Sequence, residues 1–572
     1  MKIFRYKQAI VALCCLTSTV SCSDMLLPDS EIVEFEEDNR LSTPQDTLYS
    51  VMGIIRQMQV IADRTVLLGE LRADLMTTTD KATTPIKDLA AFNLSGENPY
   101  NQVSDYYAII NNCNYFLANA DTSFVRLGKK IFEKEYAVVK TYRAWTYLQL
   151  AKVYGQVPLV TTPVLTEAQA DQEMKKPYSD IYAICDYFIK DIQPYVDTDL
   201  PAYGVINGFQ STKFYIPVRV LLGEMCLWAG RYQEAATYLS QYLTKKNDAK
   251  YTYTSKASWP DNCTDFTIAQ PRKGSVYSDL ITETNDENVT LIPMETTEFN
   301  GVKSLLENIF TSTDNNFAYF QATPSVALRE LSASQDYVQL QKTSDTQKDT
   351  VRVTKKNLGD PLYVGDLRLY GNYTEYIINR SETSRYSTNI QSINKLPGQF
   401  VCTYRMQEIY LLFAEALCRA GYPESAFCIL KYGLRNYNIE KYVCQKERER
   451  AGSLINFNDN EFTERNTQGI HARGCGDVEC DTLYRIPLPA QELRSYEDSV
   501  QFQIPLVEDM IIQEKALEMS FEGRRYYDLM RIAMRRNDNS YLATPISKRN
   551  GTKNNTLFNI LMDNKNWYLP LN

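Results

Sequence analysis

The chain has 572 residues, of which 44% are hydrophobic and 23% charged, an ordinary balance for a globular protein with a large core. Its formal net charge at pH 7 is −9, and loss of residues 1–21, which hold Lys2, Arg5 and Lys7 and no acidic residue, would make it −12. An acidic surface without a basic stripe offers little to phosphate backbones, so nucleic acid is not an expected partner.

Side chains suited to catalysis are scarce. The chain has one histidine, His471, which excludes an HExxH zinc motif and allows a Ser-His-Asp triad only if it uses that residue. A GxSxG elbow and a P-loop are absent from the sequence. The stretch GIHARGCGD, residues 469–477, is interpreted as a glycine-rich turn that holds His471 structurally. No catalytic residue, metal site or cofactor is predicted.

The N-terminus has the layout of a secretory signal. Basic residues precede the apolar block 9–16, which is too short to span a membrane. The stretch TVSC, residues 19–22, resembles a bacterial lipobox, so we predict removal of residues 1–21 and lipidation of Cys22. The alternative is ordinary signal-peptidase cleavage with Cys22 as an incidental thiol. The acidic residues 22–40 are expected to form a flexible tether.

Apolar residues at spacings of three and four predict a scaffold of amphipathic helices. The first helix is expected over about 44–62. Residues 142–160 predict a helix that ends at Gly155 before an extended stretch. Residues 517–535 predict a helix-turn-helix that pivots at Gly523.

Two later stretches match each other in register. LGEMCLWAGRYQEAATYL at 222–239 and FAEALCRAGYPESAFCIL at 413–430 have the spacing of a tetratricopeptide (TPR) hairpin, in which small residues such as Gly223 let two helices approach closely. Trp145 and Trp228 lie inside such patterns, so we expect both to pack between helices. Hairpins separated by long insertions predict a predominantly all-α scaffold that carries elaborate loops.

The helical period fades between about 245 and 400. The stretch NVTLIPME predicts a strand, and the rest is rich in turn formers. Loops on a rigid scaffold tend to carry function, so the binding surface is expected here. Trp259, in SKASWPDNC, could stack on a ligand or cap a local cluster, and both interpretations stay open. Tyr277 lies in the same polar stretch.

The thirteen cysteines are irregularly spaced in a chain long enough to fold without a disulfide frame. Most are expected to be buried thiols. Cys475 and Cys480 are close enough in sequence to pair in an oxidising compartment.

An ordered set of segments resembles the SusD/RagB outer-membrane lipoproteins of Bacteroidetes. The segments are the CSD start at 22–24, GELRADLM at 69–76, YYAIINNCNYFLANA at 106–120, EYAVVKTYRAWTYLQLAKVYGQVPLV at 135–160, YRMQEIYLLFAEALCRAG at 404–421 and IIQEKALEMSFEGRRYYDLMR at 511–531. The resemblance implies a SusD-like fold, with TPR-like helical hairpins, a large loop-rich ligand-binding half and a few short strands. It divides the chain into a signal peptide (1–21), a tether (22–40), an N-terminal region with hairpins (41–245), a loop-rich ligand-face region (246–400) and a C-terminal region (401–572).

The resemblance also implies a function. Such proteins capture an oligosaccharide, or in some members peptides, at the cell surface and deliver it to a SusC-like TonB-dependent transporter, without chemistry on the ligand. The helical hairpins would face the transporter, and the lipid on Cys22 would hold the protein on the outer membrane. A chain with 41 tyrosines suits sugar binding, because sugar rings stack on flat aromatic side chains.

Several residues are candidates for the ligand face. Members of the family often place ligand aromatics where Phe317 and Tyr319 lie, and Tyr100 and Asn101 fall in a loop that helps line the ligand face in relatives. The full set of predicted ligand-binding residues is Trp259, Tyr319, Phe317, Tyr277, Tyr100, Asn101, Arg72 and Asp74. Arg72 and Asp74 could equally pair with neighbours as structural residues. Glu415, Glu522, Arg524 and Arg525 are expected to belong to the scaffold.

Two other functions remain open. A surface glycoside hydrolase would need two carboxylates about 5 to 9 Å apart across a cleft, and nothing in the sequence distinguishes such a pair. A TPR-type adaptor would bind a protein segment in the groove of its hairpins.

Overall fold

The computed structural model describes residues 44–123, 125–126, 128–130, 132–206, 208–245, 252–260, 263, 266, 269–272, 285–294, 301–311, 320–342, 348–353, 364–379, 387–396, 398–489 and 495–571. The predicted signal peptide, Cys22 and the tether lie outside these residues. No helix in the described part of the chain is long and apolar enough to cross a membrane.

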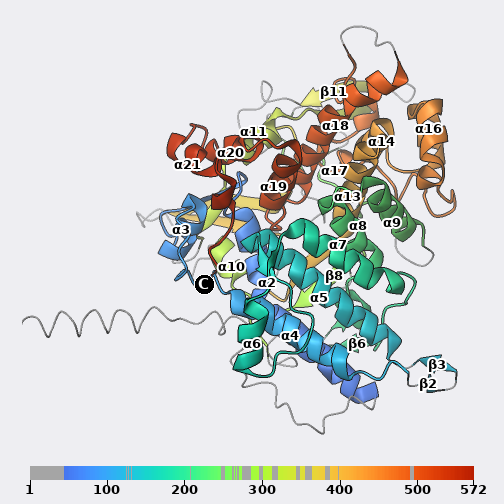
Figure 1. The fold of residues 1–572 in the computed structure, drawn as a ribbon. Helices are drawn as coiled ribbons and strands as arrows, with labels where there is room; N and C mark the ends of the chain where they lie inside the picture. The colour runs from blue at the N-terminus through green and yellow to red at the C-terminus, as the bar shows by residue number, and fades with distance from the viewer. Residues whose placement is uncertain are drawn as a thin grey trace, which may run out of the picture.

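Helices dominate the described chain (Figure 1). The first half contains α2 (Pro44–Glu70), α3 (Thr84–Ala91), α4 (Val103–Asn119), α5 (Glu133–Tyr154), α6 (Glu167–Met174), α7 (Ile181–Ile192), α8 (Val218–Trp228) and α9 (Tyr232–Thr244). The second half contains α10 (Leu306–Phe310), α11 (Val326–Ser334), α12 (Arg368–Asn372), α13 (Met406–Arg419), α14 (Pro423–Lys431), α15 (Asn436–Tyr442), α16 (Gln445–Ala451), α17 (Ala472–Cys475), α18 (Tyr496–Glu518), α19 (Arg525–Arg536), α20 (Ser540–Ser547) and α21 (Asn555–Leu561). The predicted predominantly helical fold is confirmed.

The described strands are short and form separate antiparallel pairs. The pairs are β1 (Met76–Thr78) with β9 (Ala322–Pro324), β2 (Val125–Arg126) with β3 (Lys129–Lys130), β4 (Val157–Pro158) with β5 (Tyr178–Ser179), β6 (Val205–Ile206) with β7 (Phe209–Gln210), β8 (Asn288–Pro293) with β14 (Phe400–Arg405), β10 (Tyr337–Lys342) with β11 (Lys348–Val353), and β12 (Tyr373–Asn379) with β13 (Ser387–Ile393). β8 confirms the strand predicted from NVTLIPME.

Helix α2 begins where predicted but runs eight residues past the expected end. Its apolar stripe, including Val51, Ile54 and Ile61, is buried in the main core. The last turn stays helical because it packs closely on a distant turn: a Cβ added to Gly69 would lie 1.9 Å from the carbonyl oxygen of Gly523. Gly523 has φ +80 in the turn between α18 and α19, which confirms the predicted pivot.

Consecutive helices pack as hairpins, with α4 against α5, α8 against α9 and α13 against α14. Close approach depends on small residues, since a Cβ added to Gly223 of α8 would lie 2.5 Å from Leu239 of α9. Trp145 and Trp228 are 2% and 3% exposed, so the prediction that they pack in the core is confirmed. Cys475 and Cys480 form no disulfide with each other, so the predicted possibility of a pair is wrong.

Candidate functional site

The predicted ligand residues Arg72 and Asp74 lie in the buried turn that leads from α2 into β1. The Arg72 guanidinium donates to the carbonyls of Leu68 (2.8 Å) and Trp567 (3.0 Å), and it lies 4.2 Å from the ring centroid of Tyr526. The Asp74 carboxylate accepts two hydrogen bonds from Arg525, at 2.7 and 2.8 Å. These hydrogen-bond partners of Arg72 and Asp74 are all groups of the protein itself. The structure therefore favours the structural interpretation of these two residues.

This turn fixes the place of β1 and its partner strand. The hydroxyl of Ser325 donates to the carbonyl of Asp74, and β1 pairs with β9 through Met76 opposite Pro324. Beyond β1, the backbone N–H of Thr79 donates to the carbonyl of Gln321 at 2.9 Å. The next residues, Asp80 and Lys81, are exposed. The buried Arg72 and Asp74 thus fix the position of a short polar edge, Asp80 and Lys81, that faces solvent.

Tyr100 and Asn101 lie in the loop between α3 and α4. Asn101 is 4% exposed and its side-chain amide donates to the carbonyl of Pro570 at 3.0 Å, so it anchors the loop to the C-terminal segment. Tyr100 is half-buried, with its backbone N–H bonded to the Asn98 side chain. Burial, with a smaller contribution from Asp63, raises the pKa of the Tyr100 hydroxyl. Tyr100 is therefore a neutral, partly exposed ring on a fixed loop.

A third segment, residues 301–311, is held against α2. The Asp63 carboxylate accepts from the Ser304 hydroxyl (2.8 Å) and from the backbone N–H of Leu305 (2.7 Å). Burial raises the pKa of Asp63 despite these two hydrogen bonds, which act in the opposite direction. The Leu305 side chain is 54% exposed, so this segment adds an apolar edge.

Residues 77–81, 93–102 and 301–311 are the candidate ligand-binding segments, and we call them together the ligand face. Phe317 and Tyr319 lie outside the described residues, as does Tyr277. Their flanking residues are described: the backbone N–H groups of Phe320 and Gln321 donate to the carbonyls of Asn308 and Ile309. The chain thus leaves α10 and returns to β9 beside the ligand face. A half-exposed aromatic ring, hydroxyls, a carboxylate and a lysine are groups that can bind a sugar without reacting with it.

Trp259 lies in a small core cluster with Ala257, Cys263, Tyr337, Val353, Val364 and Leu367. Its side chain is 1% exposed, and its ring meets Phe266 edge-on with centroids 5.1 Å apart. Its backbone N–H donates to the Tyr337 hydroxyl at 3.2 Å. This burial favours the interpretation that Trp259 caps a local cluster. In the described structure the Trp259 ring has no exposed face on which a ligand could stack.

A network of buried charges lies beyond the end of α2. We call it the charge network: Glu287, Asp366, Arg368, Lys395, Arg405, Arg473, Glu514, Glu518 and Glu522, linked by ion pairs. Glu518 contacts Arg368, Arg405 and Arg473. Although burial alone would raise the pKa of Glu518, these arginines hold it well below its usual value. The network fixes β14, α12 and α17 against α18.

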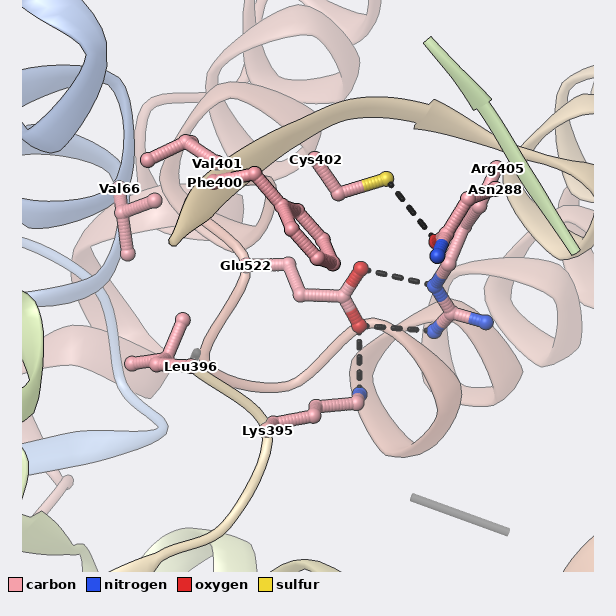
Figure 2. A pocket seen from close by; sticks show the side chains of 9 residues that line it. All are labelled: Val66, Asn288, Lys395, Leu396, Phe400, Val401, Cys402, Arg405 and Glu522. Atoms are coloured by element: carbon pink, nitrogen blue, oxygen red, sulfur yellow. Dashed lines mark hydrogen bonds and ion pairs between the residues drawn. The ribbon is translucent and has the colours of Figure 1, made fainter. Parts of the chain in front are cut away.

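Figure 2 shows one end of the charge network beside a cavity of about 30 Å³. The Glu522 carboxylate accepts from Arg405 at 2.7 and 2.8 Å and pairs with the Lys395 amine at 2.6 Å. Burial opposes ionisation, but the two cations lower the pKa of Glu522 to about 2. The cavity has room for roughly one or two water molecules and none for a sugar ring.

The four expected scaffold residues all have buried or half-buried ionic partners. Glu415 pairs with Arg531, Glu522 with Arg405, Arg524 with Glu408 and Arg525 with Asp74. The sequence patterns did not identify Arg368, Arg405 or Arg473 as buried ionic residues. A charged residue directly next to buried apolar stretches, as Arg405 is at the end of FVCTYR, is a signal that could have found them.

The fold is that of a helical scaffold protein whose loops carry the candidate ligand face. Residues 335–572 match the model of the SusD family. This match covers less than half of the chain, and the described chain as a whole has the SusD-like fold.

Three solved structures of Bacteroides proteins share this fold. A SusD superfamily protein from Bacteroides vulgatus ATCC 8482 has a TM-score of 0.52 and 13% identity over 93% of this chain and 96% of that chain. A SusD-like protein from Bacteroides fragilis NCTC 9343 has a TM-score of 0.53 and 15% identity over 88% of each chain. A SusD-like carbohydrate binding protein from Bacteroides vulgatus ATCC 8482 has a TM-score of 0.51 and 16% identity over 86% of this chain and 83% of that chain. No curated protein matches the sequence.

Proposed function

We propose that the protein binds an oligosaccharide at the cell surface and delivers it to a SusC-like TonB-dependent transporter, without changing the ligand chemically. The observation that carries this proposal is the SusD match over residues 335–572, joined to the SusD-like fold of the described chain. One of the structures that share the fold is of a carbohydrate binding protein.

The ligand face supports sugar binding. The half-buried ring of Tyr100 offers a flat surface to sugar C–H groups, while Thr77 and Thr78 of β1 and the following Asp80 offer hydroxyl and carboxylate partners. Arg72 and Asp74 act below the face, as positioning residues that hold this edge in place. Phe317, Tyr319 and Tyr277 remain proposed ligand aromatics.

Delivery requires an anchor and a partner surface. Lipid on Cys22 would hold the protein on the outer membrane. The helical half presents exposed apolar side chains that a transporter could cover, among them Tyr182 and Tyr187 of α7 and Phe502 and Leu506 of α18. Incorporation of labelled fatty acid that is lost in Cys22→Ser tests the anchor.

The binding experiment screens purified protein against oligosaccharides and peptides and then measures affinity by calorimetry. Tyr100→Ala should weaken binding of the selected glycan about tenfold, whereas Tyr100→Phe should keep most of the affinity because the ring remains. Tyr437→Ala is the matched control, since Tyr437 is 59% exposed on α15, outside the ligand face.

Three outcomes would contradict the proposal. Binding of peptides but no glycan would favour the peptide-uptake alternative. Turnover of a bound glycan would make the protein a glycoside hydrolase. Equal affinity in Tyr100→Ala and Tyr437→Ala, with the ligand mapped to the helical hairpins, would favour a TPR-type adaptor.

A further inference from the structure

Three side chains with metal-ligating atoms meet in the interior at one end of the charge network. Asp366, His471 and Cys475 each offer one ligand atom, and these atoms all lie within 4.8 Å of one another. The side chains are 0%, 1% and 0% exposed. Asp366 comes from the segment before α12, whereas His471 and Cys475 are one helical turn apart at α17. Sequence spacing predicted no metal site because the acidic donor lies about a hundred residues from the other two.

The distance between two of these donors fits a tetrahedral ion. The Cys475 Sγ lies 3.4 Å from Asp366 Oδ2. Two ligands at zinc–sulfur and zinc–oxygen distances of about 2.3 and 2.0 Å, separated by a tetrahedral angle, are about 3.5 Å apart. The thiol donates to Asp366 Oδ2, so these two atoms already face each other at a spacing that an ion could bridge.

The single histidine is oriented as metal-binding histidines usually are. The Nδ1 atom of His471 lies 2.8 Å from Glu514 Oε2, and the ring stacks on Tyr484 with centroids 3.7 Å apart. A carboxylate at Nδ1 fixes the proton on that nitrogen and leaves the lone pair on Nε2. The carboxylate–histidine arrangement is typical of the groups that support a zinc ligand.

Arg368 is the strongest competitor for Asp366. Its guanidinium contacts both Asp366 oxygens, with the shortest distance 2.5 Å to Oδ2, and it also contacts Glu514 at 2.6 Å. A carboxylate has about four lone-pair positions, so Oδ2 can accept Arg368 and still bind an ion on the side of Cys475. Arg368 repels a cation bound at Asp366. Arg368 also contacts Glu514 and Glu518, and we expect these two carboxylates to offset that repulsion.

The backbone near Asp366, His471 and Cys475 lets their three ligand atoms approach one another. A Cβ added to Gly474 would lie 2.0 Å from Asp366 Oδ1, so only glycine lets the Asp366 carboxylate press against α17. The backbone N–H of Cys475 donates to the carbonyl of His471 at 3.0 Å, which fixes the spacing of these two ligands. Gly469, Ala472 and Gly476 line an adjoining cavity of about 300 Å³, which places solvent-accessible space beside the segment that carries the ligands.

We propose that Asp366, His471 and Cys475 bind one Zn²⁺ ion, with Glu514 as the positioning residue of the histidine. The mixed sulfur, nitrogen and oxygen donors suit zinc and would fill three of its four tetrahedral positions. On binding, the Cys475 S–H bond breaks, the proton leaves to solvent and a sulfur–zinc bond forms, with no change in oxidation state. The ion would brace α17 and α12 against α18.

The test uses the full chain purified without a polyhistidine tag. Zinc-loaded protein, dialysed against metal-free buffer, should retain about one zinc per chain by elemental analysis. X-ray absorption should show one sulfur and one imidazole ligand, and the imidazole can only be His471 because the chain has one histidine. This measurement needs no variant. A spectrum without sulfur or without imidazole, or a chain without bound zinc, would overturn the proposal.

Variants then assign the ligands. Cys475→Ser and His471→Gln should each lose the retained zinc, and Glu514→Gln should weaken zinc affinity roughly 10- to 100-fold. Cys480→Ser is the matched control, since Cys480 is a cysteine close in sequence that does not belong to the cluster, and this variant should retain zinc unchanged. Equal retention in Cys475→Ser and Cys480→Ser would overturn the assignment.

Discussion

Asp74 and Arg525 are 451 positions apart in the sequence and form a buried, two-point ion pair at 2.7 and 2.8 Å. The pair joins the turn before β1 to the first residue of α19. Beside it, Arg72 donates to the carbonyl of Trp567, so two polar residues of one turn tie the start of the ligand face to the last part of the chain. Figure 1 shows the blue helix α3 and the red helices α20 and α21 on the same side of the molecule.

Asp74→Asn should lower the free energy of unfolding by about 3–5 kcal/mol, because Arg525 would keep a buried charge without its carboxylate. Denaturant titration followed by circular dichroism measures the change. Asp80→Asn is the matched control: Asp80 is exposed six residues away, and its replacement should change stability by less than about 0.5 kcal/mol. A similar small effect in both variants would show that Asp74 is free to serve a ligand.

Trp259→Ala should destabilise the protein by about 3–5 kcal/mol, since it removes a large side chain that is 1% exposed. Thermal unfolding measures this, with Tyr437→Ala as the control for an exposed aromatic ring. If Trp259→Ala instead unfolds like the wild-type protein but loses glycan affinity, Trp259 is a ligand aromatic after all.

Glu70→Gln should make the protein more stable above pH 7. The Glu70 carboxyl is fully buried and accepts from the backbone N–H of Gly523 at 2.8 Å; burial raises its pKa to about 7. Because the folded-state pKa lies above the ordinary value of 4.5, this group costs stability as the pH rises from about 4.5 to 7, up to about 3 kcal/mol.

Denaturant titrations at pH 5 and pH 8 measure this effect. The gain in Glu70→Gln should be small at pH 5 and largest at pH 8. The exposed residue Glu97 supplies the control, because Glu97→Gln should give the same small difference at both values. A gain for Glu70→Gln that does not change with pH would mean that the buried carboxyl has an ordinary pKa.

Gly523→Ala should lower stability by more than about 2 kcal/mol. Gly523 has φ +80, and an added Cβ would lie 2.2 Å from the carbonyl oxygen of Thr65. Gly204→Ala is a close control, because Gly204 has φ +77 with open space around it and should cost only the backbone strain of about 1 kcal/mol. Equal losses in thermal unfolding would show that the contact with α2 contributes nothing.

The sequence predicted the helical scaffold well because the pattern that specifies each hairpin lies within one short stretch of sequence. The apolar spacing before Gly230 and Gly421, both with positive φ, marks two helices and the turn between them. The extension of α2 beyond residue 62 was missed, since its last turn is stabilised by contact with Gly523 rather than by its own periodicity.

The candidate site was less predictable for the same reason. Tyr100 and Asn101 lie in one short loop, yet only the structure shows that Asn101 anchors the loop to Pro570 while Tyr100 stays half-exposed. The partners of Arg72, Asp74 and Glu518 are remote in sequence, so no local pattern distinguishes a charge that binds ligand from one that is buried in an ion pair.

Arg72 and Asn101 donate to carbonyls near the C-terminus, and Arg549 donates to the carbonyl of Leu71. These contacts determine when the N-terminal segments can fold during synthesis. The ribosome makes α2 and β1 first, but their partners emerge only with the final residues of the chain. Long-range pairing of this kind delays folding until synthesis is nearly complete. A prematurely terminated copy that stops before residue 549 would keep the predicted signal peptide and lipobox and lack the contacts that hold the proposed ligand face in place.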